Sequence, residues 1–538
     1  MACTNVTVKS DSNENKVDKT TSKSIKQYIR QYCENSSIQG LFYFSTESSF
    51  LEGCWWTIVF ILCLSGCFVM IKEIVDKWNN SPVLFSLATI ETPIFKVPFP
   101  AVSICPETKI SKRCLNYSKV LRFRNNGSLE SISEQEMNYF DHMAPLCRLE
   151  NHINSSQDRD LDDYISFLDK CKSVNLQQAF CEWKGKIVNC SKILHPLITD
   201  DGLCYSFNML NIRDIYSDVN QMDYYQEHKK HSIWNVESGY PANKTTNIFP
   251  RRIFGIGAMN SLVVTFFTKK SDVYASCQDF SLQGLKVSIH LPSTIPRPNQ
   301  VSFTAGFDEV SSVAIKVDMT TTTKEVKNYS PAKRKCYFRE ERKLKYFKFY
   351  SQSNCDMECW TNYTIQECGC VHFYMPRDKN TTICKLSEVQ CLHNAQDSYA
   401  LSIFPMEYRH GEITKGKLDK NCNCLPSCAD INYLTEISKS KWSWGNAQGI
   451  HARYFKKYSK EYHASAVRVF FKTSQFFATE KSELYGATSF LSNAGGILGL
   501  FLGFSSVSLV ELIYFSSIKL IENRRKYGTV FGNWKQQK

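Results

Sequence analysis

The chain has 538 residues, a formal net charge of +13 and 23 cysteines. The positive charge does not indicate a nucleic-acid partner, because the lysines are dispersed and the sequence has no basic tail and no nucleic-acid-binding motif. An enzyme is disfavoured as well, since the sequence contains no nucleophile elbow, no H-E-x-x-H motif and no phosphate-binding loop.

Residues 1–52 are polar, and they lack the basic and then apolar start of a cleaved signal peptide. An uncharged run follows from Gly53 to Ile71, between Glu52 and Lys72. At about 1.5 Å per residue, this run can cross a hydrocarbon core about 30 Å thick. We therefore predict a cytosolic segment over residues 1–52 and a first transmembrane helix over residues 53–75.

Residues 76–483 contain 18 of the 23 cysteines, all between Cys105 and Cys428. An even number of cysteines in one segment predicts disulfides formed in an oxidising compartment. N-glycosylation triplets occur in the same segment, at Asn116, Asn126, Asn154, Asn189, Asn243, Asn328, Asn362 and Asn380. The segment is therefore predicted to be extracellular, with both termini cytosolic. The positive-inside rule supports this in part: Arg524, Arg525 and Lys526 follow the second span, but the twenty residues before the first span contain no Lys or Arg.

Apolar residues alternate in three parts of the extracellular segment, as expected for half-buried strands. The alternating sets are Leu285, Val287, Ile289 and Leu291; Val313, Ile315, Val317 and Met319; and Val467, Val469 and Phe471. By contrast, Leu344, Phe347 and Tyr350 recur at helical spacing, which predicts a charged helix within residues 339–350. A mixed α and β domain is expected.

The cysteines are densest from Cys336 to Cys428, a spacing that zinc sites also use. Zinc needs free thiolates, however, and an extracellular chain oxidises them, so we expect disulfides and no metal. A ladder of cross-links would stiffen an element that has to transmit force.

Near the C-terminus, the run from Leu484 to Val510 is uncharged and rich in glycine, and Glu511 follows it before further apolar residues up to Ile518. Each glycine costs roughly 0.5–1 kcal/mol in a helix interior, and an acid inside a membrane marks a functional site by default. We predict a second transmembrane helix that lines a pore over residues 484–518, and a cytosolic segment over residues 519–538. The simpler interpretations are helix packing through Gly499 and Gly503 and a Glu511 side chain that reaches the cytosolic interface.

Five motifs occur in order: SSIQG before the first span, FPAVSIC from Phe99 to Cys105, GLCYSFN from Gly202 to Asn208, the clustered cysteines, and SNAGGILGLFLGFSSVSLVE from Ser492 to Glu511. Over about residues 36–515, the chain resembles the degenerin and epithelial sodium channel superfamily, and most of all an arthropod pickpocket subunit. The resemblance implies a homo- or heterotrimer in the plasma membrane, with two helices per chain and a hand-shaped extracellular domain. It also implies sodium permeation, amiloride sensitivity and no cofactor.

The resemblance assigns roles to individual residues. The selectivity filter corresponds to Gly503, Phe504 and Ser505, whose carbonyls and hydroxyls would replace part of the water around a cation. The pore and gate correspond to Ser492, Asn493, Gly495, Gly496, Gly499 and Glu511, and the N-terminal gating motif to Gln39 and Gly40. Gln39 stands where the family has a histidine, and Phe504 is bulky where the best-studied members have a small residue.

The resemblance also implies seven disulfides: Cys105–Cys204, Cys181–Cys190, Cys336–Cys428, Cys355–Cys424, Cys359–Cys422, Cys368–Cys391 and Cys370–Cys384. The five bridges within residues 336–428 correspond to the thumb of the family. Cys114, Cys147, Cys171 and Cys277 are left over, and their pairing stays open.

The stimulus also stays open among force, protons, peptides, lipids and hydrocarbons. Asp158, Asp160, Asp162 and Asp163 could form the paired carboxylates of a proton sensor, but a solvated or helix-capping loop is the favoured interpretation. His290 and His372 are expected to be ordinary surface or strand residues. The alternative function is a glycosylated two-span scavenger or adhesion receptor that conducts no ions. An ATP-gated trimeric channel has the same outline but different motifs.

Overall fold

The computed structural model describes residues 25–527 apart from 26, 45–49, 81–82, 126–131, 144, 148–163, 218, 220–223, 226–231, 233, 242–247, 274–281, 404–421, 447–451 and 485. The chain divides into two compact units. The helical unit comprises residues 1–84 and 482–538, and the sheet unit comprises residues 85–481. The acidic cluster from Asp158 to Asp163 lies outside the described residues.

The helical unit contains one long helix and one broken helix. The long helix is α2 (Phe50–Asn80), which follows the short helix η1 (Leu41–Phe44). The broken helix consists of α12 (Ala487–Leu502), α13 (Ser506–Ile513), a π-helix η11 (Tyr514–Ile518) and α14 (Lys519–Tyr527). Residues 27–35 are helical too.

Helix α2 has the length and composition of a membrane span over Leu51–Asn80. Large apolar side chains such as Trp55, Leu62 and Phe68 are exposed along it, as expected for a surface that faces lipid. The second candidate meets the same criteria only as a pair of helices, Ala487–Leu502 and Ser506–Lys526, which bend by 78°.

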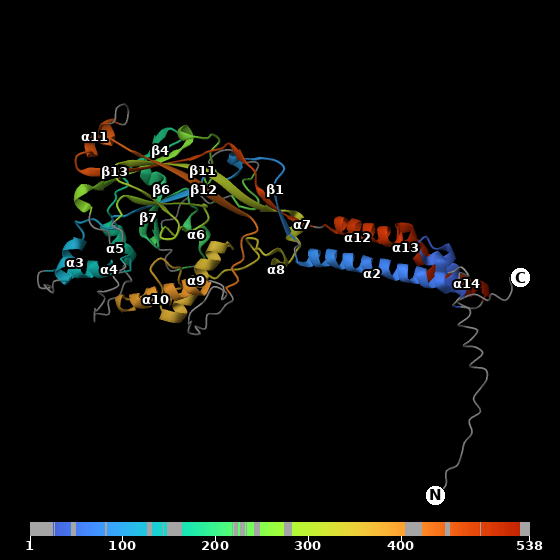
Figure 1. The fold of residues 1–538 in the computed structure, drawn as a ribbon. Helices are drawn as coiled ribbons and strands as arrows, with labels where there is room; N and C mark the ends of the chain where they lie inside the picture. The colour runs from blue at the N-terminus through green and yellow to red at the C-terminus, as the bar shows by residue number, and fades with distance from the viewer. Residues whose placement is uncertain are drawn as a thin grey trace, which may run out of the picture. The chain divides into compact units, whose positions relative to one another are not determined.

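Helices α2 and α12 run side by side (Figure 1). Trp78 of α2 stacks on Phe490 at one end, with ring centroids 4.9 Å apart. Nearer the other end, Gly66 lets Phe501 approach, because a Cβ atom at Gly66 would lie 3.0 Å from Phe501 Cε1. A small residue opposite a ring allows the two helices to come close.

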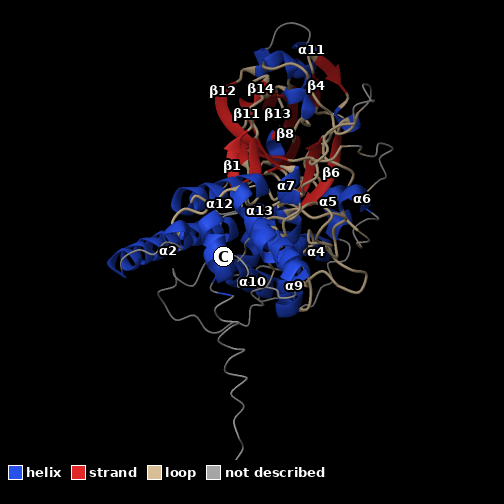
Figure 2. Cartoon of the chain, turned by 90° about the vertical axis from the view of Figure 1, so that its right-hand side faces the viewer, coloured by secondary structure: helices blue, strands red, loops and turns tan. Residues whose placement is uncertain are grey.

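The sheet unit is built on two sheets, whose strands are drawn in red in Figure 2. The larger sheet has eight strands, in the order β1-β15-β11-β13-β8-β4-β5, with β12 paired to β11. Its strands are β1 (Val83–Leu87), β4 (Phe180–Trp183), β5 (Lys186–Val188), β8 (Leu262–Lys269), β11 (Glu309–Thr322), β12 (Asp430–Lys441), β13 (Tyr462–Phe471) and β15 (Thr479–Glu483).

The smaller sheet has five strands, in the order β10-β9-β3-β7-β6. They are β3 (Ala101–Pro106), β6 (Leu194–Thr199), β7 (Gly202–Phe207), β9 (Leu285–His290) and β10 (Phe303–Ala305). A separate pair joins β2 (Thr92–Pro93) to β14 (Gln475–Phe476). The three strands expected from alternating residues are present as β9, β11 and β13.

The two sheets share one apolar core. Ile104 and Phe207 come from the smaller sheet, and Phe266, Ile315 and Val469 come from the larger one, and all five are fully buried. Each such side chain contributes about 1.5–3 kcal/mol by leaving water. Alternation along each strand therefore places the apolar face of each sheet toward the other.

Helices cover the rest of the sheet unit: α3 (Tyr117–Asn125), α4 (Glu134–His142), α5 (Tyr164–Cys171), α6 (Ile212–Ile215), α7 (Lys324–Lys327), α8 (Pro331–Arg334), α9 (Gln352–Cys368), α10 (Val389–Ile403) and α11 (Ala452–Tyr458). A second core joins α4 and α5 to α9 through Phe140, Phe167 and Trp360. The mixed α and β architecture thus agrees with the expected fold class.

The helix predicted within residues 339–350 is wrong. This segment is irregular and is held by backbone hydrogen bonds from Lys348 N to Ile215 O and from Ser217 N to Tyr346 O, both 2.9 Å long. Tyr346, Phe347 and Phe349 are all buried there, within a core that includes residues from other parts of the chain. The helical spacing of apolar residues arose from a segment that inserts aromatic side chains on several sides.

All seven disulfides implied by the resemblance are present in the structure. An eighth joins Cys114 to Cys171, two of the residues whose pairing was open. Cys147 is disulfide-bonded as well, and Cys277 lies outside the described residues.

Candidate functional site

The three residues assigned to the filter lie where the second long helix breaks. Helix α12 ends at Leu502, and Gly503 takes the left-handed conformation, with φ of 61° and ψ of 21°. Gly503 N donates to Gly499 O at 2.9 Å, which closes the last turn. The left-handed cap favours glycine because any other residue would place a Cβ atom against the backbone.

Ser505 begins the next helix. Its hydroxyl accepts a hydrogen bond from Ser508 N at 3.3 Å, and Ser508 Oγ accepts one from Ser505 N at 3.1 Å. This reciprocal cap satisfies two amides that a helix start would otherwise leave free. The break is therefore a stable feature in which Gly503 ends one helix, Phe504 connects, and Ser505 starts the next.

The N-terminal gating motif contacts this break. Gln39 N donates to Leu502 O at 2.9 Å, so it satisfies one of the carbonyls at the end of α12. The Gln39 side chain lies against Gly503, since a Cβ atom there would lie 2.6 Å from Gln39 Cγ. Gly40 has a φ of 92°, which turns the chain away toward η1. Residues far apart in the sequence thus form one site.

Glu511 lies on α13 and accepts two hydrogen bonds from Ser37. Ser37 N and Ser37 Oγ each lie 2.9 Å from Glu511 Oε2. Ser37 Oγ lies 2.6 Å from the buried Ser508 Oγ, and Ser508 Oγ lies 3.2 Å from Ser505 Oγ. Each hydroxyl has one proton to donate. Ser505 Oγ can donate to Ser508 Oγ, Ser508 Oγ to Ser37 Oγ, and Ser37 Oγ to the Glu511 carboxylate, so that each of these four groups has a partner.

Ser37 is the site residue that sequence reasoning missed. It belongs to the SSIQG motif, in which only Gln39 and Gly40 were assigned a role. Ser37 lies two residues before Gln39. Serine is common in turns and loops, where its short hydroxyl side chain forms hydrogen bonds, so its presence here was the available indication of a contact with another element. Its partner Glu511 lies 474 positions away in the sequence.

Five of the six residues assigned to the pore and gate lie on α12, and Glu511 lies on α13. Ser492 and Asn493 are exposed, and a Cβ atom at Gly495 or Gly496 would meet nothing within 4 Å. Ser492, Gly496, Gly499 and Gly503 follow one another at steps of three or four, which places them on one helical face. We call these four residues the small-residue face.

The N-terminal helix is also attached to the π-helical turn. Tyr28 Oη donates to Phe515 O at 2.5 Å, and the rings of Tyr28 and Tyr32 both pack edge-on against Phe515. A π-helix shifts its carbonyls out of the normal pattern, which makes one available to an outside donor. The N-terminal segment therefore contacts the second, broken helix at two places, with Tyr28 at the π-helical turn and Gln39 at the break.

In the sheet unit, the described group of side chains closest to a metal-site geometry includes two cysteines that are bonded to each other. Cys370, Cys384 and Glu388 lie close enough to hold an ion, but the two sulfurs are joined in a disulfide and offer no thiolate. Three bridges attach α9 to its surroundings: Cys355–Cys424, Cys359–Cys422 and Cys368–Cys391. Helices α9 and α10 thus form the cross-linked element that was expected to be a thumb.

Four of the predicted glycosylation sites are exposed: Asn189, Asn328, Asn362 and Asn380. Asn116 is half-buried and caps the turn before α3, where its Oδ1 accepts from Lys119 N at 3.3 Å. Asn126, Asn154 and Asn243 lie outside the described residues.

Comparison with known proteins identifies relatives over almost the whole chain. Pickpocket protein 28 of Drosophila melanogaster is 26% identical over 533 residues, covering 95% of this chain and 81% of its own length. Pickpocket protein 11 of the same organism is 25% identical, covering 91% of this chain and 75% of its own length. The Drosophila melanogaster sodium channel protein Nach is 22% identical, covering 92% and 89%.

The amiloride-sensitive sodium channel family matches residues 32–515, a range that includes the N-terminal loop, both sheets and the helix break. This confirms the resemblance found in the motifs. Members of the family are ion channels and not enzymes, and the relatives indicate a sodium channel subunit of the degenerin type. The chain belongs to the amiloride-sensitive sodium channel family.

Proposed function

We propose that three copies of this chain, or of this chain and related subunits, form a sodium-permeable, amiloride-sensitive channel in the plasma membrane. Each copy crosses the membrane twice, once through α2 and once through α12 and α13, with residues 76–483 outside and both termini in the cytosol. The exposed apolar surface of α2, the bent helix pair and the disulfides of the sheet unit support this topology.

The small-residue face of α12 lines the pore in this proposal. The opposite side of α12 packs on α2 through Phe490 and Phe501, so Ser492, Gly496 and Gly499 remain for neighbouring subunits and water. Two helices per chain cannot enclose a pore alone, and a threefold arrangement brings three such faces together.

The single observation that carries the proposal is the capped break at Gly503–Ser505. A broken helix leaves carbonyls without helical partners, and inside a membrane this is tolerated only where protein or water satisfies them. In a threefold assembly, the Gly503 carbonyls and Ser505 hydroxyls form rings that replace part of the hydration shell of Na⁺. Glu511 concentrates cations at the inner mouth while it holds Ser37.

The first experiment tests the gate. Ser492→Phe places a bulky side chain in the narrow passage and is expected to hold the channel open, which two-electrode recording detects as a constitutive inward sodium current. Leu491→Phe is the matched control, because Leu491 is exposed beside the small-residue face and points elsewhere. A Ser492→Phe protein that reaches the surface without such a current, alone or with a relative, contradicts the assignment of Ser492.

The second experiment tests the filter. Ser505→Ala removes a hydroxyl from the proposed ring and is expected to change the sodium-to-potassium permeability ratio, read from reversal potentials. Ser506→Ala is the control, since Ser506 is exposed on the following turn. Equal reversal potentials in all three proteins argue against a filter at this position.

We do not assign the stimulus that opens the channel. In this proposal, force or a ligand acts on the sheet unit, and the second transmembrane helix responds. The alternative of a scavenger or adhesion receptor has no support from the family match or the relatives.

A further inference from the structure

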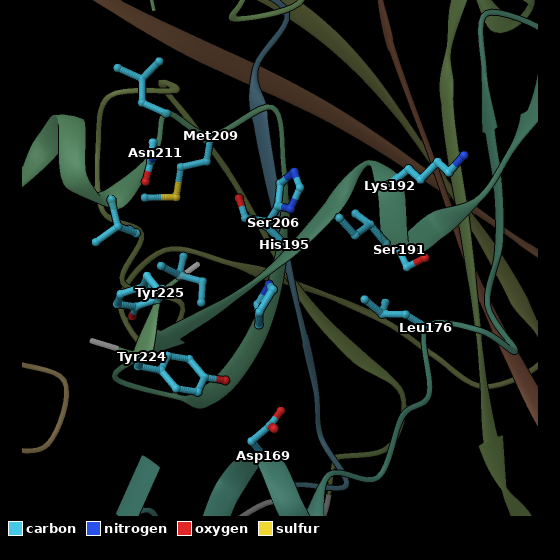
Figure 3. A pocket seen from close by; sticks show the side chains of 15 residues that line it. Asp169, Leu176, Ser191, Lys192, His195, Ser206, Met209, Asn211, Tyr224 and Tyr225 are labelled. Carbon is cyan, nitrogen blue, oxygen red and sulfur yellow. The ribbon is translucent and has the colours of Figure 1, made fainter. Parts of the chain in front are cut away.

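A cavity lies beside β6, the edge strand of the five-stranded sheet, far along the sequence from the pore residues. Its volume is about 580 Å³, which is within the range of about 300–1,000 Å³ typical of sites for small organic ligands. The walls come from α5, β6, the segment between β7 and α6, and the pair Tyr224 and Tyr225 (Figure 3).

The floor of the cavity is apolar. Leu197 of β6 lies in one buried cluster with Met209 and Ile212 from the segment that follows β7, and all three side chains are at least nine-tenths buried. Such a floor favours the apolar body of a ligand, at about 25 cal/mol for each Å² that it removes from water.

The edge of β6 is closed to an added peptide strand. Ile198 N donates to Tyr225 Oη at 3.2 Å, so this outward amide already has a partner. Residue 196, two positions earlier on the same edge, is a proline and has no N–H. Without two successive outward donors, strand addition is disfavoured, and recognition must come from side chains.

The charged group that faces the cavity is an acid. Figure 3 shows the Asp169 carboxylate and the Tyr224 hydroxyl directed toward the same space, whereas the Lys192 side chain points away. Burial raises the pKa of Tyr224, and the charge of Asp169 raises it further. Tyr224 therefore stays neutral, and the cavity presents one negative charge beside an aromatic ring.

The present partner of Asp169 is easily displaced. Lys172 Nζ lies 3.0 Å from Asp169 Oδ1, and the two side chains are 45% and 48% exposed. An exposed ion pair of this kind contributes only about 0–1 kcal/mol. A ligand ammonium that also stacks on Tyr224 gains the same attraction and a cation–π contact.

We propose that this cavity binds a small organic ammonium compound. Its protonated amine pairs with Asp169 beside the Tyr224 ring, and its apolar body covers Leu197, Met209 and Ile212. This site is separate from the ion pathway, and its test does not depend on conduction.

The test uses the purified full-length protein and two photoreactive probes of nearly equal shape. One is 4-azidophenethylamine, a cation, and the other is 3-(4-azidophenyl)propionic acid, an anion. After illumination, mass spectrometry locates the adducts, and excess unlabelled phenethylamine measures specific labelling. We expect the cationic probe to label peptides within residues 190–225 more than the anionic one, by up to about fivefold, as one exposed ion pair provides.

Two variants with opposite expected effects complete the experiment. Asp169→Asn removes the charge and is expected to reduce cationic labelling by up to about fivefold, whereas Lys172→Gln frees Asp169 and is expected to leave labelling equal or higher. Both positions are half-exposed, and gel filtration confirms that each variant is folded. Equal labelling by the two probes, equal labelling of the Asp169→Asn variant, or adducts confined to other segments overturns the proposal.

Discussion

At Gly503 the conformation and the neighbours of one residue both require glycine. A side chain there would meet Gln39 at 2.6 Å and would occupy a φ of 61°. Strain in the left-handed region costs about 1–2 kcal/mol, and the Gln39 loop would have to move as well. We expect Gly503→Ala to change the sodium-to-potassium permeability ratio.

The control for this substitution is Gly496→Ala. Gly496 lies on the same face of α12, but a Cβ atom there meets nothing within 4 Å. Reversal potentials should therefore remain near those of the unmodified channel in this variant. The account of Gly503 is wrong if Gly503→Ala keeps its selectivity while Gly496→Ala loses it.

Ser37 and Glu511 should act as one unit. Hydrogen bonds to a carboxylate contribute about 1.5–3 kcal/mol, and groups within one network do not add. We expect Ser37→Ala and Glu511→Gln each to reduce sodium current per channel at the surface, and the double variant to be no worse than the stronger single one. Additive losses in this double-mutant cycle would show that the two residues act separately.

Two residues of the sheet unit, His290 and Asp200, should change the stability of the protein in opposite directions when the pH falls. Burial lowers the pKa of His290 from 6.5 to about 4. Between about pH 6.5 and 4, this histidine is therefore protonated in the unfolded chain but not in the folded chain. The free energy of unfolding decreases as the pH falls through that range. Burial raises the pKa of Asp200 from 3.8 to about 6, so the folded chain takes up the proton first and gains stability as the pH falls from about 6 to 4.

Melting temperatures of the full-length protein in detergent at pH 7 and pH 5 measure both effects. From these values, His290 contributes a loss of up to about 2 kcal/mol on acidification and Asp200 a gain of up to about 1.4 kcal/mol. His290→Gln should therefore reduce the acid-induced fall in melting temperature, and Asp200→Asn should increase it. Changes in the same direction would refute the assignment of one of the two groups.

Among the elements, the contact of α2 with α12 depends on one small residue. Gly66 faces the Phe501 ring at a distance that leaves no room for a larger side chain. We expect Gly66→Val to force the helices apart and to reduce the amount of folded protein, measured by fluorescence-detected gel filtration. Gly53→Val, at a position with nothing within 4 Å, is the matched control, and equal profiles would contradict this packing.

Regular elements were predictable where one periodicity dominated. Residues of β9, β11 and β13 alternate because each strand has one face in the core between the sheets. The run from Gly53 to Ile71 lies within the longer helix α2, because Lys72, Glu73 and Asp76 continue the helix past the apolar segment. Local patterns identify such elements but not their ends.

The segment of residues 339–350 was not predictable in this way. Its aromatic residues are buried by contacts from other parts of the chain, such as the bridge between Tyr216 and Phe347. Periodicity within a window cannot register partners more than a hundred positions away. The bridge between Cys114 and Cys171 was open for the same reason, since it depends on where α3 and α5 pack.

Over the whole molecule, the site was predictable residue by residue but not as a set of contacts. Gln39, Gly503 and Glu511 were each singled out, yet only the structure brings the first against the second and gives the third a partner in Ser37. The cavity beside β6 had no sequence signal, because its lining comes from five separate segments. Long-range assembly of this kind requires the fold.

For the whole molecule, the proposed assembly of three chains requires one orientation of the two transmembrane helices. The small-residue face of α12 must turn toward a shared axis, and the exposed side of α2 must turn toward lipid. Burial of Ser492, Gly496 and Gly499 against other copies would then explain why a single chain leaves them open.

The most direct test is a cryo-electron microscopy structure of the purified protein in lipid nanodiscs. The account predicts three copies around an axial conduit, narrowest where the Gly503 carbonyls and Ser505 hydroxyls converge, with Glu511 below them and Ser37 on its carboxylate. An assembly without an axial conduit, or one in which Ser505 and Glu511 face lipid, would contradict it.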